Sequence, residues 1–157
     1  MTRTVIALGS NLGERELTIL DAVREIAELD GVELVAVSGL HETPALKPHG
    51  IDHEAPAYLN AVIVAESRRD PHDLLRALRG IEQHHGRVRE ERWGDRTLDL
   101  DIVDIEGVAL ATDDLTVPHP RAAERDFVLA PWLEADADAV LGGRRVSDLL
   151  AELRKST

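Results

Sequence analysis

The order in which apolar residues recur along this chain constrains its fold more than any other feature. Four segments are apolar, or alternately apolar, over the length of a strand and predict β-structure: Thr4–Leu8, Val32–Val37, Tyr58–Ala65 and Asp99–Ile105. Helical spacing of apolar residues runs from Glu14 to Asp30, and again after Asp70-Pro71, a pair typical of a helix start. The resulting β-α-β-β-α-β order predicts a ferredoxin-like α+β fold, with a mostly antiparallel sheet and both helices on one face.

Each predicted helix has an apolar stripe. In the first helix the stripe comprises Ile19, Leu20, Val23, Ile26 and Ala27. In the second it comprises Leu74, Leu75, Leu78 and Ile81. Gly31 and Gly86 stand where these patterns stop, and glycine is common just after a helix. Residues 41–57 contain several prolines, keep neither period and predict a long loop.

The last third of the chain adds further elements. It contains a predicted short strand at Val108–Ala111, a turn at Pro118-His119-Pro120, the segment Phe127-Val128-Leu129 and a final helix opened by Ser147. These elements would cover the other face of the sheet and produce three layers, α-β-α. The sequence has no repeat, low-complexity tract or linker, so we expect residues 1–157 to form a single domain.

Acidic residues outnumber basic ones by 30 to 18, which gives a formal net charge of −12. Nucleic-acid and anionic-membrane surfaces normally carry a basic patch, so this balance argues against both partners. The chain has no cysteine, which excludes disulfides and thiolate zinc sites. No apolar run approaches the roughly 18 residues of a membrane span and no signal-peptide pattern is present, so we expect a cytoplasmic protein.

Residues Arg92–Ile102 hold the strongest functional signal, with the sequence R-W-G-D-R-T-L-D-L-D-I. If the second half is a strand, Asp99 and Asp101 share one face about 6.5–7 Å apart, while Leu98, Leu100 and Ile102 point into the core. Two such carboxylates can hold one or two hard cations, and nearby arginines can bind phosphate oxygens. This pattern predicts a polyphosphate site on an inner strand; the alternative is an edge strand with a solvated acidic face.

Charge arithmetic supports a role for the metal. From Arg87 to Asp101 the chain has four arginines and five acidic residues, a net charge of −1. Two Mg²⁺ ions would bring this to +3, so the segment would attract a triphosphate only with metal bound.

Other candidate residues each have a plainer structural interpretation. Arg87, Arg89, Arg92 and Arg96 could equally form a solvated loop paired with Glu90 and Glu91. Trp93 lacks apolar neighbours, which fits a mobile lid better than a core position. Glu82 either turns to solvent at a helix end or is buried against a ligand or an arginine.

Two further pairs of residues are weak signals by themselves. Tyr58 and Asn60 share one face of their strand, which ordinary packing also explains. His119 and Arg125 could donate to phosphate or could simply belong to a structural turn.

Several motifs occur together in a fixed order. Besides Arg92–Ile102, these are G-S-N-L-G at 9–13, E-T-P at 42–44, Y-L-N-A at 58–61, T-V-P-H at 116–119 and R-D-F-V-L at 125–129. In this order the chain resembles the 6-hydroxymethyl-7,8-dihydropterin pyrophosphokinase family of folate biosynthesis. The resemblance implies an Mg-dependent diphosphotransferase that moves pyrophosphate from ATP to the pterin hydroxymethyl oxygen and releases AMP. It would be a monomer with these two small molecules as its partners.

The resemblance also implies residue roles. Asp99 and Asp101 would bind two Mg²⁺ and, with Arg87 and Arg96, form the catalytic set. The pterin would lie between Tyr58 and Phe127, with its polar edge read by Asn60 and by backbone groups of Thr43, Pro44, Ala45 and Leu46, and with Trp93 closing over it. The nucleotide would contact Glu82, Arg87, Arg96, Ile102, Thr116, His119 and Arg125. The proton acceptor would be a metal-proximal carboxylate or the phosphate itself.

Some positions depart from the family pattern, namely Glu90, Asp95, Asp114 and Pro120, and the loop Pro44–Ala57 is long. Two other functions therefore stay open beside the kinase. One is a non-catalytic ferredoxin-like ligand-binding domain, since this scaffold serves many functions. The other is an inactive paralogue that acts as an assembly partner.

Overall fold

The computed structural model describes residues 1–11, 14–43, 45–47, 50–52, 57–85 and 98–156. Its main sheet has the strand order β2 (Val32–Val37), β6 (Tyr58–Ser67), β1 (Thr2–Ser10) and β7 (Asp99–Ile105). All neighbours in this order are antiparallel. Counted along the chain, the strands across the sheet are the second, third, first and fourth. This is the strand order of a ferredoxin-like sheet, as the sequence predicts.

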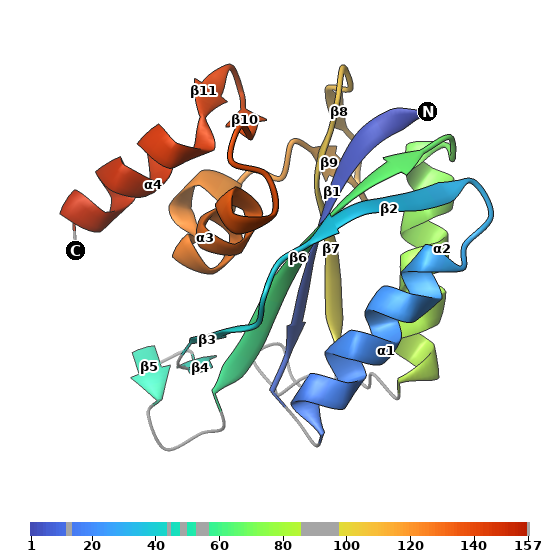
Figure 1. Cartoon of the computed structure of the whole chain (residues 1–157), viewed down its shortest axis with the longest axis horizontal. Coiled ribbons are helices and arrows are strands. Elements are labelled where there is room, and N and C mark those ends of the chain that lie inside the picture. The colour runs from blue at the N-terminus through green and yellow to red at the C-terminus, as the bar shows by residue number, and fades with distance from the viewer. Residues whose placement is uncertain (12–13, 44, 48–49, 53–56, 86–97, 157) are drawn as a thin grey trace.

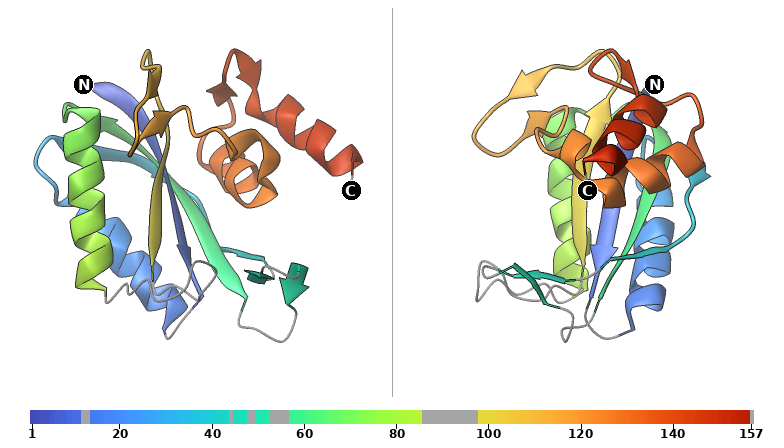
Figure 2. Two further views of the ribbon diagram at one scale, coloured as in Figure 1. Left: turned by 180° about the vertical axis from the view of Figure 1, so that it is seen from behind. Right: turned by 90° about the vertical axis from the view of Figure 1, so that its left-hand side faces the viewer.

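Helices cover both faces of the sheet, which gives the expected three layers (Figure 1). Helices α1 (Arg15–Ala27) and α2 (Pro71–His84) lie on one face. Helix α3 (Asp126–Ala135) packs on the other face against β6, and α4 (Val146–Lys155) packs on α3 (Figure 2). Because both faces are covered, β6 is buried on both sides, from Asn60 to Ala65 without a break.

The two helices of the ferredoxin-like unit form largely as predicted. Asp70 caps α2 by accepting from the backbone N–H groups of His72 and Asp73, and the predicted leucine stripe is buried. In α1 the stripe is only partly correct, because Leu20 and Ala27 are exposed, and the helix ends at Ala27 rather than Asp30. Ile19, Ala22 and Ile26 define the buried face, and Leu20 lies about 100° around the helix from Ile19.

The predicted loop over residues 41–57 is wrong in part. It contains β3 (His41–Thr43), which pairs with β6 beyond the end of β2, and a small hairpin of β4 (Ala45–Lys47) and β5 (Gly50–Asp52). Three-residue strands are too short to show a period, and their pairing with β6 is a tertiary interaction that local sequence does not encode.

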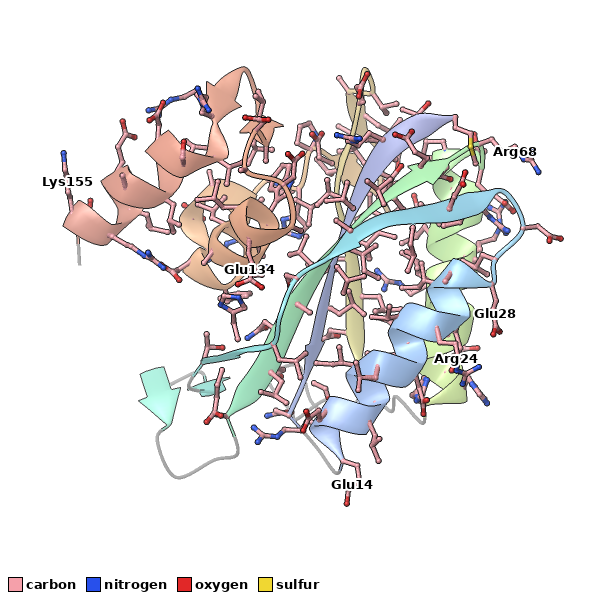
Figure 3. The ribbon with its side chains drawn as sticks, in the orientation of Figure 1. Glu14, Arg24, Glu28, Arg68, Glu134 and Lys155 are labelled. Carbon is pink, nitrogen blue, oxygen red and sulfur yellow. The ribbon has the colours of Figure 1, made fainter. Side chains whose placement is uncertain are left out.

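Helix α3 is also tied to this edge of the sheet. The Glu134 carboxylate accepts from the Gly39 backbone N–H, and its other oxygen lies 3.1 Å from His41 Nε2 (Figure 3). These contacts lower the pKa of Glu134, the Gly39 bond being the larger cause. A Cβ at position 39 would stand 2.9 Å from Glu134 Oε1, so a larger residue there would push this carboxylate away.

The last third differs from the prediction in detail. Strand β8 is Leu110–Ala111 only, and it pairs with β9 (Thr116–Val117). A 3₁₀ turn at Ala122–Glu124 precedes α3, which takes in the segment 127–129, and a hairpin of β10 (Val140–Leu141) and β11 (Arg144–Arg145) leads into α4. Helix α4 starts at Val146 after Arg145, so Ser147 lies in its first turn and does not cap it. Among the described residues, no helix is both long and apolar enough to cross a bilayer.

Candidate active site

Strand β7 presents its two aspartates as the alternation predicts. Leu98, Leu100 and Ile102 are buried in the core beneath α1 and α2. Asp99 and Asp101 are half-buried on the opposite face, where they line a cavity beneath the start of α3. The strand lies at the edge of the sheet, however, and not inside it as expected.

Side chains of α2 occupy part of the free edge of β7. The Glu82 carboxylate, which is buried, accepts from the Leu100 backbone N–H at 2.8 Å. The Arg79 guanidinium donates to the Leu100 carbonyl and to Glu82, both at 2.9 Å. A strand residue directs its N–H and C=O to one side only, so Leu100 is bonded here on the side away from β1. The residue between the two aspartates is thus held by its backbone and by its buried side chain.

The cavity under α3, which we call the first cavity, gathers residues from four elements and from the turn before α3. Its lining includes Gly9 of β1, Asn60 of β6, Asp99 and Asp101 of β7, Phe127 of α3, and His119 and Arg125. Six of the predicted site residues therefore meet at one place, although they are up to 67 positions apart in the sequence.

A second cavity adjoins the first through Asp101 and His119, which line both. It lies between α2 and the β8–β9 hairpin. Its other lining residues include Arg79, Ile102, Thr112, Asp113, Asp114 and Thr116. The predicted residues Ile102 and Thr116 are among them. Two cavities that share a carboxylate can bring two substrates to a common point.

His119 is held against β7 and is polarised by its neighbours. Its backbone N–H donates to the Val103 carbonyl at 2.8 Å. The Arg121 backbone N–H donates to His119 Nδ1 at 3.2 Å, so the neutral ring carries its proton on Nε2. Burial lowers the pKa of His119, and Arg125 and Arg121 lower it further, while Asp101 acts in the opposite direction. The ring is therefore a neutral Nε2–H donor at pH 7.

Arg125 lies close enough to both aspartates to interact with them electrostatically. Burial lowers its pKa, and this is opposed first by Asp101 and also by Asp99. Its guanidinium carbon lies 5.6 Å from the centroid of the Phe127 ring. The arginine thus lies where it can contact an anionic ligand at one end of the cavity and an aromatic surface at the other.

Asn60 is buried and oriented by β3. Its amide nitrogen donates to Thr43 Oγ1 at 2.9 Å and to the His41 carbonyl at 3.3 Å. Tyr58 shares its face of β6, near Gly9, where a Cβ would lie 3.7 Å from the Tyr58 ring. Phe127 is exposed at the cavity mouth, with 36% of its surface accessible. Of the two predicted ring partners, Phe127 lines the cavity and Tyr58 is not among its lining residues.

Several predicted residues lie outside the described part of the chain: Pro44, Arg87, Arg89, Arg92, Trp93 and Arg96. Ala45 and Leu46 lie in β4, close in sequence to Thr43. Sequence reasoning missed Arg79 and Asp113. The available signal for Arg79 was its position three residues before Glu82, a spacing at which opposite charges meet on a helix.

For Glu82→Ala, we predict a loss of about 1–3 kcal/mol in unfolding free energy, because the buried Leu100 N–H loses its acceptor. Amide hydrogen exchange at Leu100 should become faster. The control is Glu152→Ala, which removes a carboxylate that pairs with Arg144 on the surface, and its loss should be much smaller. Equal losses in the two variants, with unchanged exchange at Leu100, would show that Glu82 does not hold the strand.

In metal-free protein, the imidazole of His119 should titrate below its ordinary pKa by NMR. Asp101→Asn should lower the pKa further, because the carboxylate that favours the imidazolium is removed, and Arg125→Gln should raise it. The pKa of His119 is lower in the folded state than in the unfolded state. Its contribution to the free energy of unfolding is therefore fully present above the unfolded pKa, and it is lost as the pH falls from the unfolded pKa to the folded pKa. A pKa above the ordinary value would contradict this picture.

The chain is similar to known proteins over most of its length. Residues 5–137 match the family model of 7,8-dihydro-6-hydroxymethylpterin-pyrophosphokinase. A 2-amino-4-hydroxy-6-hydroxymethyldihydropteridine pyrophosphokinase of Methylorubrum extorquens is 39% identical over 156 residues, covering 99% of this chain and 96% of the relative. Its namesake in Haemophilus influenzae is 37% identical over 155 residues, covering 99% of this chain and 92% of the relative.

Solved structures agree on the fold. A structure described as HPPK-DHPS in complex with substrates superposes with a TM-score of 0.74 at 13% identity, over 99% of this chain. This chain spans only 46% of that one. The HPPK-DHPS of Plasmodium falciparum with pteroate gives a TM-score of 0.73 at 12% identity, over 96% of this chain and 42% of that one. With a matching family model and relatives aligned over nearly its whole length, the chain belongs to the 7,8-dihydro-6-hydroxymethylpterin-pyrophosphokinase family.

Proposed function

We propose that this chain transfers pyrophosphate from ATP to the hydroxymethyl group of 6-hydroxymethyl-7,8-dihydropterin, with release of AMP, as a step of folate biosynthesis. The observation that carries the proposal is the position of Asp101, which lines two adjoining cavities together with His119. A reaction between two small molecules needs both held against a common centre of charge stabilisation. We also propose that residues 1–157 act as one domain and as a monomer in the cytoplasm, on the strength of the sequence and of the family resemblance.

The first cavity is assigned to the pterin. Asn60 offers an amide that can pair with the polar edge of a flat heterocycle, and its orientation is fixed by Thr43. Phe127 offers a ring face at the mouth, and Tyr58 lies on the same face of β6 as Asn60. A pterin held by these groups would direct its hydroxymethyl arm toward Asp99 and Asp101 at the far side of the cavity.

The second cavity is assigned to the nucleotide. Arg79, Thr112 and Thr116 supply donors, while Asp113 and Asp114 make this end acidic. The phosphates of a bound triphosphate would therefore point toward His119 and Arg125, which interact electrostatically with Asp101. Arg87 and Arg96 are proposed as further phosphate ligands on the strength of the sequence motif alone.

Asp99 and Asp101 fit a magnesium site. Carboxylate oxygens are the ligands this ion prefers, the two side chains share a face of β7, and both front the first cavity. When bound there, two ions would offset the charge of the phosphates and of the departing AMP. In that role the ions would make the reaction depend on Mg²⁺.

The chain's own residues then position the reaction. One bond forms between the hydroxymethyl oxygen and the β-phosphorus of ATP, and the bond from that phosphorus to the α-phosphate oxygen breaks. His119 Nε2–H and Arg125 donate to phosphate oxygens as charge shifts toward AMP. The hydroxymethyl proton passes to a nearby carboxylate or to the phosphate. The half-buried position of Asp99 and Asp101 beneath α3 reduces the access of water to them.

The assay that tests this function measures AMP release from ATP with MgCl₂, with and without 6-hydroxymethyl-7,8-dihydropterin. The proposal requires AMP to appear only when metal, ATP and pterin are all present. A non-catalytic ligand-binding domain or an inactive paralogue would release none.

For Asp101→Asn, we predict a fall in kcat on the order of a thousandfold or more with the fold intact, because one carboxylate ligand of the metal site is lost. Asp104→Asn is the matched control: Asp104 lies on the same strand but borders a different cavity near β10 and α3, and its turnover should stay near wild type. Near-wild-type turnover in Asp101→Asn would refute the metal assignment.

A further inference from the structure

The two helices on the α1–α2 face bring three metal-ligating side chains together at one end. Glu25 lies on α1, His84 is the last residue of α2, and His85 is the residue that ends it. The Glu25 carboxylate lies 2.8 Å from His85 Nε2 through one oxygen and 3.3 Å from His84 Nδ1 through the other. The candidate ligand atoms all lie within 4.8 Å of one another.

The end of the helix makes this convergence feasible. Consecutive residues inside a helix point about 100° apart, so two neighbouring histidines would not normally face one group. His85 has left the helix, with φ −92° and ψ 16°, which lets its ring turn back toward α1. The two rings meet edge to face, with centroids 5.3 Å apart.

Burial distinguishes this cluster from a chance surface pairing. The side chains of Glu25 and His85 are only 16% and 13% exposed, whereas that of His84 is 74% exposed. Two of the ligands are thus largely buried where α1 and α2 meet, and the third lies on the solvent side. Other described histidines that meet a carboxylate, such as His41 with Glu134 and His72 with Asp114, have one imidazole for each acid.

We propose that Glu25, His84 and His85 form a binding site for a divalent transition-metal ion of the zinc class, separate from the Asp99/Asp101 site. Two imidazole nitrogens and one carboxylate are a ligand set that Zn²⁺ accepts, with a fourth position left for water. Imidazole favours zinc, nickel and copper over magnesium, which prefers oxygen ligands alone. Within the described part of the chain, no other group of three or more His, Cys, Asp or Glu side chains brings its candidate ligand atoms this close together.

A bound ion would fasten the end of α2 to α1. Helix α2 also carries Arg79 and Glu82, which hold Leu100 in β7. The site therefore reinforces the helix pair on which the edge strand rests, and its direct readout is metal-dependent stability. An ion that binds the folded state alone raises the unfolding temperature with its concentration.

The test uses the full chain without an affinity tag, in excess MgCl₂ so that the oxygen site is filled with magnesium. Isothermal titration with ZnCl₂ should show one tight site, and zinc should raise the unfolding temperature by several degrees relative to EDTA. His85→Gln and Glu25→Gln should weaken zinc binding by at least about tenfold. Because His84 is largely exposed, His84→Gln should fold normally and still lose the zinc-dependent shift.

Two controls make the result specific. His72→Gln removes a histidine that faces a single acid, and Asp101→Asn disables the oxygen site; both should keep the zinc-dependent shift. The proposal is overturned if wild-type protein shows no such shift, or if His84→Gln and Glu25→Gln bind zinc like wild type. It is also overturned if Asp101→Asn abolishes zinc binding while the cluster variants retain it.

Discussion

The bonds between α2 and the backbone of Leu100 are the interaction on which the site depends. Strand β7 has β1 on one side only, and an edge strand that lacks a second neighbour leaves backbone groups unpaired. Glu82 and Arg79 supply an acceptor and a donor in place of that neighbour. Because Leu100 is also buried in the core, the flanking aspartates are held on the opposite face toward the cavities. Contacts with α2 thus hold the strand whose aspartates line the cavities on the other face of the sheet.

Much of the fold could be predicted because the strongest signals were local. Strand alternation assigned the faces of β7 correctly, and Asp70-Pro71 marked the start of α2. The failures are tertiary in origin. The pairing of β3 with β6 depends on a distant strand, the exposure of Leu20 depends on how α1 is rotated against the sheet, and the edge position of β7 depends on strand order. Periodicity does not contain any of these three facts.

In the candidate site, too, the residues marked by local motifs could be predicted, and the features that depend on tertiary structure could not. The spacing of Asp99 and Asp101 predicted a shared face, and the motifs named Asn60, His119, Arg125 and Phe127, which the fold brings to one cavity. For Glu82 the sequence left solvent exposure and burial equally open, and the structure shows it buried against Arg79 and Leu100. Its contact with nucleotide stays a prediction, as do the roles of Arg87, Trp93 and Arg96. Of the second cavity, the motifs named Asp101, Ile102, Thr116 and His119 but not Arg79 or Asp113, because only the fold brings α2 and the β8–β9 hairpin beside β7.

We propose that Asp99 and Asp101 together hold the divalent ions between nucleotide and pterin. This proposal is tested most directly by a crystal structure with a non-hydrolysable ATP analogue, the pterin and Mn²⁺ in place of Mg²⁺, with the manganese located by anomalous scattering. We expect manganese to be coordinated by both carboxylates and by phosphate oxygens, with the two organic ligands in the adjoining cavities. Manganese bound to the phosphates but out of reach of either aspartate would contradict it.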